Sequence, residues 1–285
     1  MYISMRYKTT RKIILWITFA VFALYALSLL FPFVWVLLNA FKTNAEFFDN
    51  VWRLPKEWKF SNFADAFKLK VGQTTLPDML VNSLILVVGG TVLSVFFSVC
   101  AAYVVAKYKF KGSGFIYTAA IIIMLVPTVG SLSASYKLMV DLKLYNTYIG
   151  VLLQYSGGFG FNFILLYGFL RSISWSYAEA GQIDGCSDFR IFISIMLPQA
   201  VPALFAVGIV QAIGLWNDYF TPYMFLRKHP TLAVGMQQLV STMQYGGTLP
   251  VLFALMLISL IPVIAVFSAF QKTIIENTVA GGLKG

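Results

Sequence analysis

The stretch LVNSLILVVGGTVLSVFFSVCAAYVVA, residues 80–106, carries no charged side chain. A helix needs about 20 predominantly apolar residues to cross the hydrocarbon core of a bilayer, so this stretch is long enough to span a membrane. Barrel strands are shorter and alternate in polarity, which excludes a strand of a membrane barrel. Inside lipid, a helix pairs its backbone N–H and C=O groups within itself, and the stretch therefore predicts a transmembrane helix.

Five more charge-free runs of similar size accompany this one. They cover residues 13–38, 115–136, 148–170, 199–217 and 250–270. The composition agrees, because 59% of the 285 residues are hydrophobic and 11% are charged, whereas soluble domains have roughly 25% charged residues. We therefore expect an all-α polytopic membrane protein with six transmembrane helices.

The predicted spans divide the chain into a membrane domain and two short ends. The membrane domain covers residues 13–270, with a long outer segment at 39–79 and a polar loop at 171–198. Residues 1–12 form the N-terminal end and residues 271–285 form the tail.

The charges around the first run predict that both ends are cytoplasmic. Lys and Arg totals on the two sides are nearly equal, but the first helix usually dominates, and Arg6, Lys8, Arg11 and Lys12 precede it. The cationic turn at residues 107–111 favours the same orientation. The first run is about twice as long as a signal-peptide core and lacks a cleavage site, so we expect it to be retained.

The formal net charge of +10 does not indicate nucleic-acid binding. Lys and Arg lie in short clusters between the apolar runs rather than on one basic face. Such clusters suit an anionic membrane surface, so the expected partner is the lipid bilayer and not nucleic acid. Cys100 and Cys186 are the only cysteines, one in an apolar run and one in a polar loop, and no disulfide framework is expected.

The polar loop between the fourth and fifth runs has local signals for two short helices. Ser176 and Glu179 form a capping-box pattern that predicts a helix start. Gly185 suits the left-handed residue that ends such a helix, and Ser187 can cap a second helix, which Pro198 should interrupt. The apolar residues of the second helix fall on one face at i, i+3, i+4 and i+7, namely Phe189, Phe192, Ile193 and Met196. We expect a helix-turn-helix at the cytoplasmic surface.

The same loop carries a spaced motif. Its fixed positions are Glu179, Ala180, Gly181, Gly185, Ile195, Leu197 and Pro198. The pattern resembles the E-A-A-x3-G-x9-I-x-L-P loop of ABC-importer permeases and departs from it only where Gly181 replaces Ala. A small residue is kept there, although glycine costs a helix about 1 kcal/mol relative to alanine.

The resemblance implies that the loop is the coupling helix, which sits in a groove of the ATPase subunit. Glu179, Ala180, Gly181, Asp184 and Gly185 would make this contact. Small residues permit close backbone approach, and a carboxylate at a helix start can meet a basic partner. The alternative is that Glu179 only caps its own helix.

Other stretches narrow the resemblance to carbohydrate importers, above all to the smaller, six-span permease subunit of the maltose type. These stretches are residues 144–150 (LYNTYIG), 183–185 (IDG), 216–218 (WND) and 231–235 (TLAVG). The tail NTVAGGLKG, residues 277–285, resembles the C-terminus of that subunit, which inserts between the ATPase subunits. Gly281, Gly282 and Lys284 would then contact the ATPase, and a frayed terminus is the alternative.

The resemblance also implies partners. A second permease subunit, expected to be a different chain, would complete a carbohydrate pathway in the bacterial inner membrane, and an extracytoplasmic solute-binding protein would deliver the cargo, an oligosaccharide. An ATPase dimer would bind ATP and Mg²⁺, because this chain lacks a G-x-x-x-x-G-K-[ST] phosphate loop. We expect no catalytic residue, cofactor or metal site in the chain, which would act by alternating access.

Four residues in the spans are candidates for the cargo pathway: Asn162, Gln211, Trp216 and Asn217. A neutral sugar requires amide and hydroxyl partners together with an aromatic face, which Trp216 and Asn217 offer. Interhelical hydrogen bonds and an interfacial aromatic belt would explain the same residues. In the maltose system, moreover, the larger partner subunit contributes most of the membrane substrate site.

Two other functional classes fit less well. A membrane enzyme would require convergent catalytic groups, whereas the chain has only His229 and, at an outer span edge, Asp218. A channel or ion-coupled carrier usually has ionisable residues in its spans, and the six runs have none. The outer residues 41–77, with Trp52 and Trp58, look ordered, and they are either a docking site for the binding protein or a membrane-surface cap.

Overall fold

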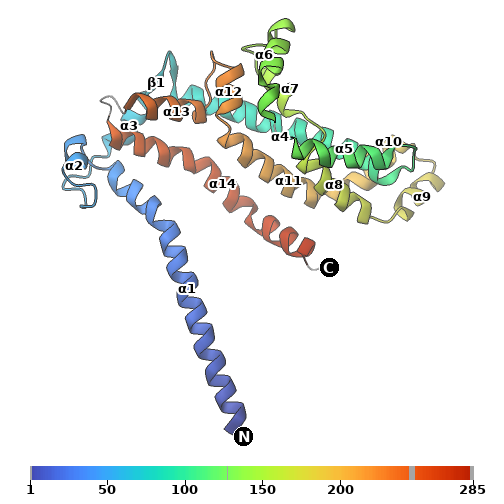
Figure 1. Ribbon diagram of the computed structural model, residues 1–285, viewed down its shortest axis with the longest axis horizontal. Helices are drawn as coiled ribbons and strands as arrows, with labels where there is room; N and C mark the ends of the chain where they lie inside the picture. Colours follow the sequence, from blue (N-terminus) through green and yellow to red (C-terminus); the bar gives the residue numbers. More distant parts are fainter. Residues whose placement is uncertain (1, 127, 244–247, 283–285) are drawn as a thin grey trace. The chain divides into compact units, whose positions relative to one another are not determined.

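The structure, a computed structural model, describes residues 2–126, 128–243 and 248–282 (Figure 1). In chain order its elements are α1 (Tyr2–Ala40), α2 (Asn44–Asp49), α3 (Ser61–Lys68), β1 (Lys70–Val71), β2 (Thr74–Thr75), α4 (Leu76–Lys107), α5 (Ser113–Leu125), η1 (Thr128–Ser131), α6 (Leu132–Asp141), α7 (Tyr148–Tyr155), α8 (Phe161–Ser172), α9 (Ser176–Ile183), α10 (Asp188–Ile191), η2 (Phe192–Met196), α11 (Leu197–Asn217), α12 (Phe220–Phe225), α13 (Leu232–Met243) and α14 (Leu249–Gly282). They form two compact units, one of Met1–Leu69 with Leu239–Leu260 and one of Lys70–Gln238 with Ile261–Gly285.

Four helices within the described residues are long and apolar enough to cross a membrane. They cover Arg11–Ala40, Leu76–Lys107, Asp188–Asn217 and Leu249–Gln271. These ranges contain the whole of the first, second, fifth and sixth charge-free runs, so the long apolar helices predicted there are confirmed.

The third and fourth runs are not single helices. In the third run, α5 ends at Leu125, and Val126 is extended (φ −79°, ψ 120°) because a residue that precedes proline avoids the helical region. In the fourth run, α7 ends at Tyr155 and α8 begins at Phe161, after Gly160 with a φ of +129°. The expectation of one continuous helix is wrong for both runs, and six membrane crossings remain a prediction.

In the first unit, the end of α1 is held by the segment that follows it. Asn62 Nδ2 donates hydrogen bonds to the carbonyl oxygens of Ala40 and Lys42, both at 2.8 Å. Lys42 Nζ donates to the carbonyl oxygens of Asn50 (3.0 Å) and Val51 (3.1 Å). The last carbonyls of a helix have no partner within it, and Asn62 supplies one here. The outer segment is therefore folded, as the sequence predicts.

In the second unit, α4 is the central helix and packs against α5, α7, α8 and α11. Its first turn is fixed by Asp78, whose carboxylate accepts hydrogen bonds from the Thr75 N–H (3.0 Å) and the Thr75 hydroxyl (2.6 Å). The hairpin of β1 and β2, in which Val71 pairs with Thr74, leads into this turn. The carboxyl-terminal half of α4 supplies part of the core on which the polar loop is built.

Candidate functional site

The first half of the polar loop is α9, which ends at a left-handed glycine. Gly185 has a φ of +76°, a conformation that costs little only for glycine. The N–H of Cys186 donates to the Gly181 carbonyl at 2.9 Å, and the N–H of Gly185 donates to the Gln182 carbonyl at 3.0 Å. This pair of bonds is a Schellman motif, and it confirms the predicted role of Gly185 as the residue that ends the helix.

The predicted capping box at the start of α9 is wrong. Ser176 is the first helical residue, and Trp175, which makes no side-chain cap, precedes it. The hydroxyl of Ser174 instead accepts a hydrogen bond from the Ser176 N–H at 3.3 Å. The carboxylate of Glu179 is exposed in the first turn and has no hydrogen-bond or ion-pair partner among the described residues. It is therefore free to meet a partner.

The second half of the loop continues into the membrane helix without a break. Ser187 occupies the cap position in an extended conformation (φ −69°, ψ 156°), as predicted, although its side chain makes no cap bond. One helix then runs from Asp188 to Asn217. The predicted interruption at Pro198 is wrong, because a turn of π-helix, η2, ends at Met196, two residues before the proline. The Leu197 N–H there reaches the Phe192 carbonyl. Such a widened turn gives the proline ring room within a continuous helix.

The π-helical turn also changes which residues are buried. Met196 is fully buried and Ile191 is 1% exposed, whereas Phe189 is 73% exposed and Ile193 is 44% exposed. The four apolar residues expected on one face therefore do not share a buried face. A strict α-helical spacing does not hold across five residues of π-helix.

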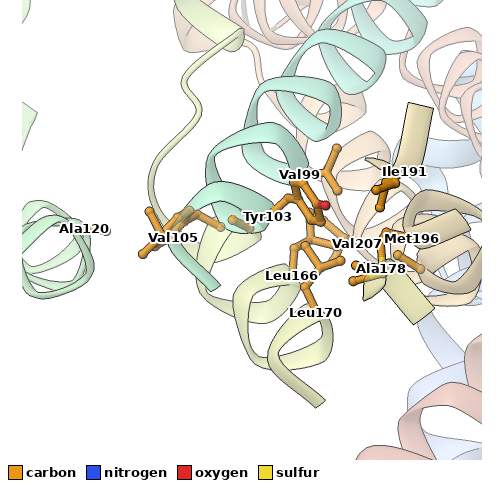
Figure 2. Close-up of a cluster of buried hydrophobic side chains, with 13 residues drawn as sticks. Val99, Tyr103, Val105, Ala120, Leu166, Leu170, Ala178, Ile191, Met196 and Val207 are labelled. Atoms are coloured by element: carbon orange, nitrogen blue, oxygen red, sulfur yellow. The ribbon is translucent and has the colours of Figure 1, made fainter. Parts of the chain in front are cut away.

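The loop stands on a hydrophobic core shared with α4 and α8 (Figure 2). Ala178 of α9 is fully buried in this cluster, beside Leu166 and Leu170 of α8. The ring of Tyr103 on α4 lies 4.6 Å from the ring of Phe192. These contacts join the loop to the carboxyl-terminal half of α4 and to α8.

Gly181 provides the closest contact within the loop. A Cβ at this position would lie 2.6 Å from Ile195 Cδ1 and 3.2 Å from Ile191 Cγ1. Gly181 is buried by its own chain, so the small residue allows α9 to press against the helix that continues into the membrane. The structure places Gly181 away from the exposed surface on which the other predicted coupling residues lie.

That exposed surface has a polar and an apolar part. Glu179, Ala180, Asp184 and Gly185 are all exposed. Ile183, 86% exposed, lies between them in the sequence, and Phe189, 73% exposed, follows at the start of α10. Ile183 was expected only as part of the IDG stretch and not as a contact residue, although an isoleucine within an otherwise polar turn was the available signal. A large apolar side chain exposed at a polar turn suits a protein interface.

The four candidate pathway residues fall into two sets. Asn162 Nδ2 donates to Gln211 Oε1 at 2.9 Å and to Ser94 Oγ at 3.2 Å, which joins α8, α11 and α4. Trp216 and Asn217 lie at the end of α11, where Asn217 Nδ2 donates to the Ile213 carbonyl of its own helix at 2.8 Å. Ser94 was not predicted, because a single serine in an apolar run gives no sign of its partners.

The tail residues lie on α14. Gly281 and Gly282 are its last two residues, so the helix runs well into the predicted tail. Lys284 lies outside the described residues.

Comparisons with known proteins agree on one family. The family model described as "Binding-protein-dependent transport system inner membrane component" matches residues 94–278. The chain is 32% identical over 266 residues to the probable ABC transporter permease protein YurM of Bacillus subtilis, which covers 92% of this chain and 86% of the relative. It is 33% identical over 273 residues to the arabinooligosaccharides transport system permease protein AraQ of the same species, covering 93% and 94%.

Two further matches extend this agreement. The chain is 30% identical over 268 residues to the diacetylchitobiose uptake system permease protein NgcG of Streptomyces coelicolor, covering 93% of this chain and 87% of the relative. A chain of a bacterial ABC transporter involved in the import of the acidic polysaccharide alginate has a similar structure. The TM-score is 0.77 at 25% identity, and the match covers 90% of this chain and 94% of that chain.

Proposed function

Because the chain belongs to the family of binding-protein-dependent transport system inner membrane components, we propose that it is the subunit through which an ABC importer moves an oligosaccharide across the bacterial inner membrane. The observation that carries the proposal is the loop of α9 and α10, a rigid helical turn with a free carboxylate and an exposed isoleucine. The cargo class is supported by relatives named for arabinooligosaccharides and diacetylchitobiose.

The proposed coupling surface consists of Glu179, Ala180, Asp184 and Gly185, with Ile183 among them. Ile183 would enter an apolar part of the ATPase groove, and Glu179 would meet a basic group there. Ala180 and Gly185 add little bulk, so the ATPase backbone can come close. Gly181 is not part of this surface. Its lack of a side chain lets α9 pack closely against the helix Asp188–Asn217.

A displacement of α9 would reach the membrane helices through the covalent chain and through the side-chain contacts of the loop. Closure of the ATPase dimer would displace α9, and the contact of Gly181 with Ile191 and Ile195 would carry the displacement to the helix Asp188–Asn217. The core around Ala178 would carry it to α4 and α8. Rigid movement of these helices would then switch the pathway between its two open states.

Several parts of the complex belong to this proposal. A second permease subunit, of different sequence, completes the pathway, a solute-binding protein delivers cargo, and the ATPase dimer holds ATP and Mg²⁺. This chain crosses the membrane six times with both ends cytoplasmic, and Gly281, Gly282 and Lys284 reach the ATPase. Asn162 and Gln211, bonded to each other, hold α8 and α11 together beside the pathway, and Trp216 and Asn217 face the cargo.

The test is ATP hydrolysis by the co-expressed and co-purified complex, with and without binding protein loaded with an oligosaccharide. Glu179→Arg reverses the charge of the free carboxylate, and Lys109→Glu is the matched control, a charge reversal at an exposed lysine of the cationic turn 107–111. We expect Glu179→Arg to abolish stimulation by the binding protein, or to release the ATPase, and Lys109→Glu to leave the stimulation intact. Equal stimulation in both variants, or a wild-type chain that purifies without any ATPase, would contradict the proposal.

A further inference from the structure

The outer segment turns back along α1 instead of continuing away from the membrane. The ring of Trp52 lies 6.1 Å from the ring of Phe31 and 6.1 Å from the ring of Trp35. Both neighbours belong to α1, whose last residue is Ala40. At a rise of 1.5 Å per residue, they lie about 14 and 8 Å back from the end of the helix. Trp52 is therefore beside the membrane-spanning part of α1 and not above it.

Two sets of hydrogen bonds hold the turn in this position. Lys42, 1% exposed, donates from Nζ to the carbonyl oxygens of Asn50 (3.0 Å) and Val51 (3.1 Å). Asn50 Oδ1 accepts hydrogen bonds from the N–H groups of Trp52 (2.8 Å) and Arg53 (3.2 Å). A buried ammonium group and a side-chain oxygen thus fix the four residues from Asn50 to Arg53, so the position of Trp52 is built into the fold.

Residues 48–54, which contain this turn, expose large apolar side chains to the surroundings. Trp52 is 71% exposed, Phe48 is 67% exposed and Leu54 is 63% exposed. Phe31, which stacks on Trp52, is itself 55% exposed on α1. The exposed apolar surface of the turn is therefore continuous with that of a membrane-spanning helix, and Arg53 is exposed within it.

We propose that residues 48–54 form an aromatic anchor in the lipid interface at the carboxyl end of α1. Trp52 lies at the boundary of the acyl chains and headgroups, where tryptophan is enriched in membrane proteins. Arg53 reaches the lipid phosphates, since a long cationic side chain can extend toward the headgroups while its stem lies on apolar surface. The partner of this surface is the bilayer rather than the binding protein, because the turn points back along the span.

Trp58 is a matched comparison within the same segment. It is also exposed, at 52%, but its ring lies 5.2 Å from that of Phe41, which follows the last residue of α1. Trp58 should therefore lie near the end of α1 and outside the acyl region.

The experiment measures tryptophan quenching in full-length protein reconstituted with its complex into phosphatidylethanolamine–phosphatidylglycerol vesicles. The emission of Trp52 is obtained by subtracting the emission of the Trp52→Phe variant from that of the wild type, and the emission of Trp58 is obtained in the same way from Trp58→Phe. Both variants keep an aromatic ring at the substituted site. Lipids with a nitroxide label near the top of the acyl chain should quench the Trp52 emission, and aqueous iodide should quench the Trp58 emission more strongly. Trp52 emission that responds to iodide and not to labelled lipid would overturn the proposal, as would its protection by added binding protein. Neither result depends on ATP hydrolysis, so the outcome is separate from the test of the transport function.

Discussion

Replacing Gly181 by alanine tests whether α9 is packed tightly onto the helix that enters the membrane. The new Cβ would lie 2.6 Å from Ile195 Cδ1 and 3.2 Å from Ile191 Cγ1. In an open helix this change stabilises by about 1 kcal/mol, whereas overpacking a core costs about 1–3 kcal/mol. The close Ile195 atom is the end of a flexible side chain and can shift, so we expect a net loss of about 0–2 kcal/mol.

Ile195→Val is the matched partner, because it deletes Cδ1, the atom that the new Cβ would meet. Alone, it should cost about 0.5–1.5 kcal/mol. In the double variant the alanine methyl group occupies the space that Cδ1 vacates, so the combined loss should be smaller than the sum of the single losses by about 0.5 kcal/mol or more.

The assay is the apparent melting temperature of the purified complex, with ATP hydrolysis stimulated by binding protein as the second readout. The double variant should melt at or above the temperature of Ile195→Val alone, and its stimulation should recover relative to Gly181→Ala. A Gly181→Ala complex that melts above the wild type would refute the packing argument, because it would mean that position 181 behaves as an open helical site.

Three further predictions concern other parts of the chain. Asn62→Ala leaves the carbonyls of Ala40, the last residue of α1, and of Lys42 without their partner and should cost about 1–3 kcal/mol, seen as faster hydrogen exchange in the outer segment; exchange at the wild-type rate would mean that the side chain does not hold the end of α1. Burial lowers the pKa of Lys42 below its ordinary 10.5. The folded chain therefore binds the Lys42 proton less tightly than the unfolded chain does. The stability of the fold, measured as its melting temperature, should rise with pH in the window just below 10.5. Lys42→Met removes the titrating group and should abolish this rise. Gly185→Ala forces a methyl group into a left-handed conformation at a cost of about 1–2 kcal/mol and should reduce stimulated ATP hydrolysis, while Gly185→Asn should retain more of it; equal activity of the two variants would count against a strained turn.

Sequence patterns predicted the long apolar helices because their signal is local. A charge-free run of sufficient length has to satisfy its backbone within itself, and this requirement correctly predicts a helix at residues 80–106. The runs at 115–136 and 148–170 meet the same requirement and are interrupted, so length and apolarity predict a helix but do not guarantee one. The end of α9 was also predictable, since Gly185 and its neighbours form a motif that closes within six residues.

Other features depend on contacts that a linear pattern does not contain. The capping box at Ser176 failed because Ser174 supplies the bond to the helix start. The continuous helix through Pro198 depends on a π-helical turn, which has no reliable sequence signature. Asn162, Gln211 and Ser94 come from three helices, so their hydrogen bonds appear only once the helices are packed.

The central claim, that the exposed surface of α9 is the contact with an ATPase, is tested most directly by cross-linking. Cys100 and Cys186 are first replaced by Ser, and Ala180→Cys then places a single thiol on the exposed surface, with Lys56→Cys in the outer segment as the control. We expect a thiol-to-amine cross-linker to join Ala180→Cys to the ATPase subunit in the purified complex, with a yield that changes when nucleotide binds, and to leave Lys56→Cys unlinked to it. Failure of Ala180→Cys to link to the ATPase in a complex that still hydrolyses ATP, or equal linking from both positions, would contradict the account.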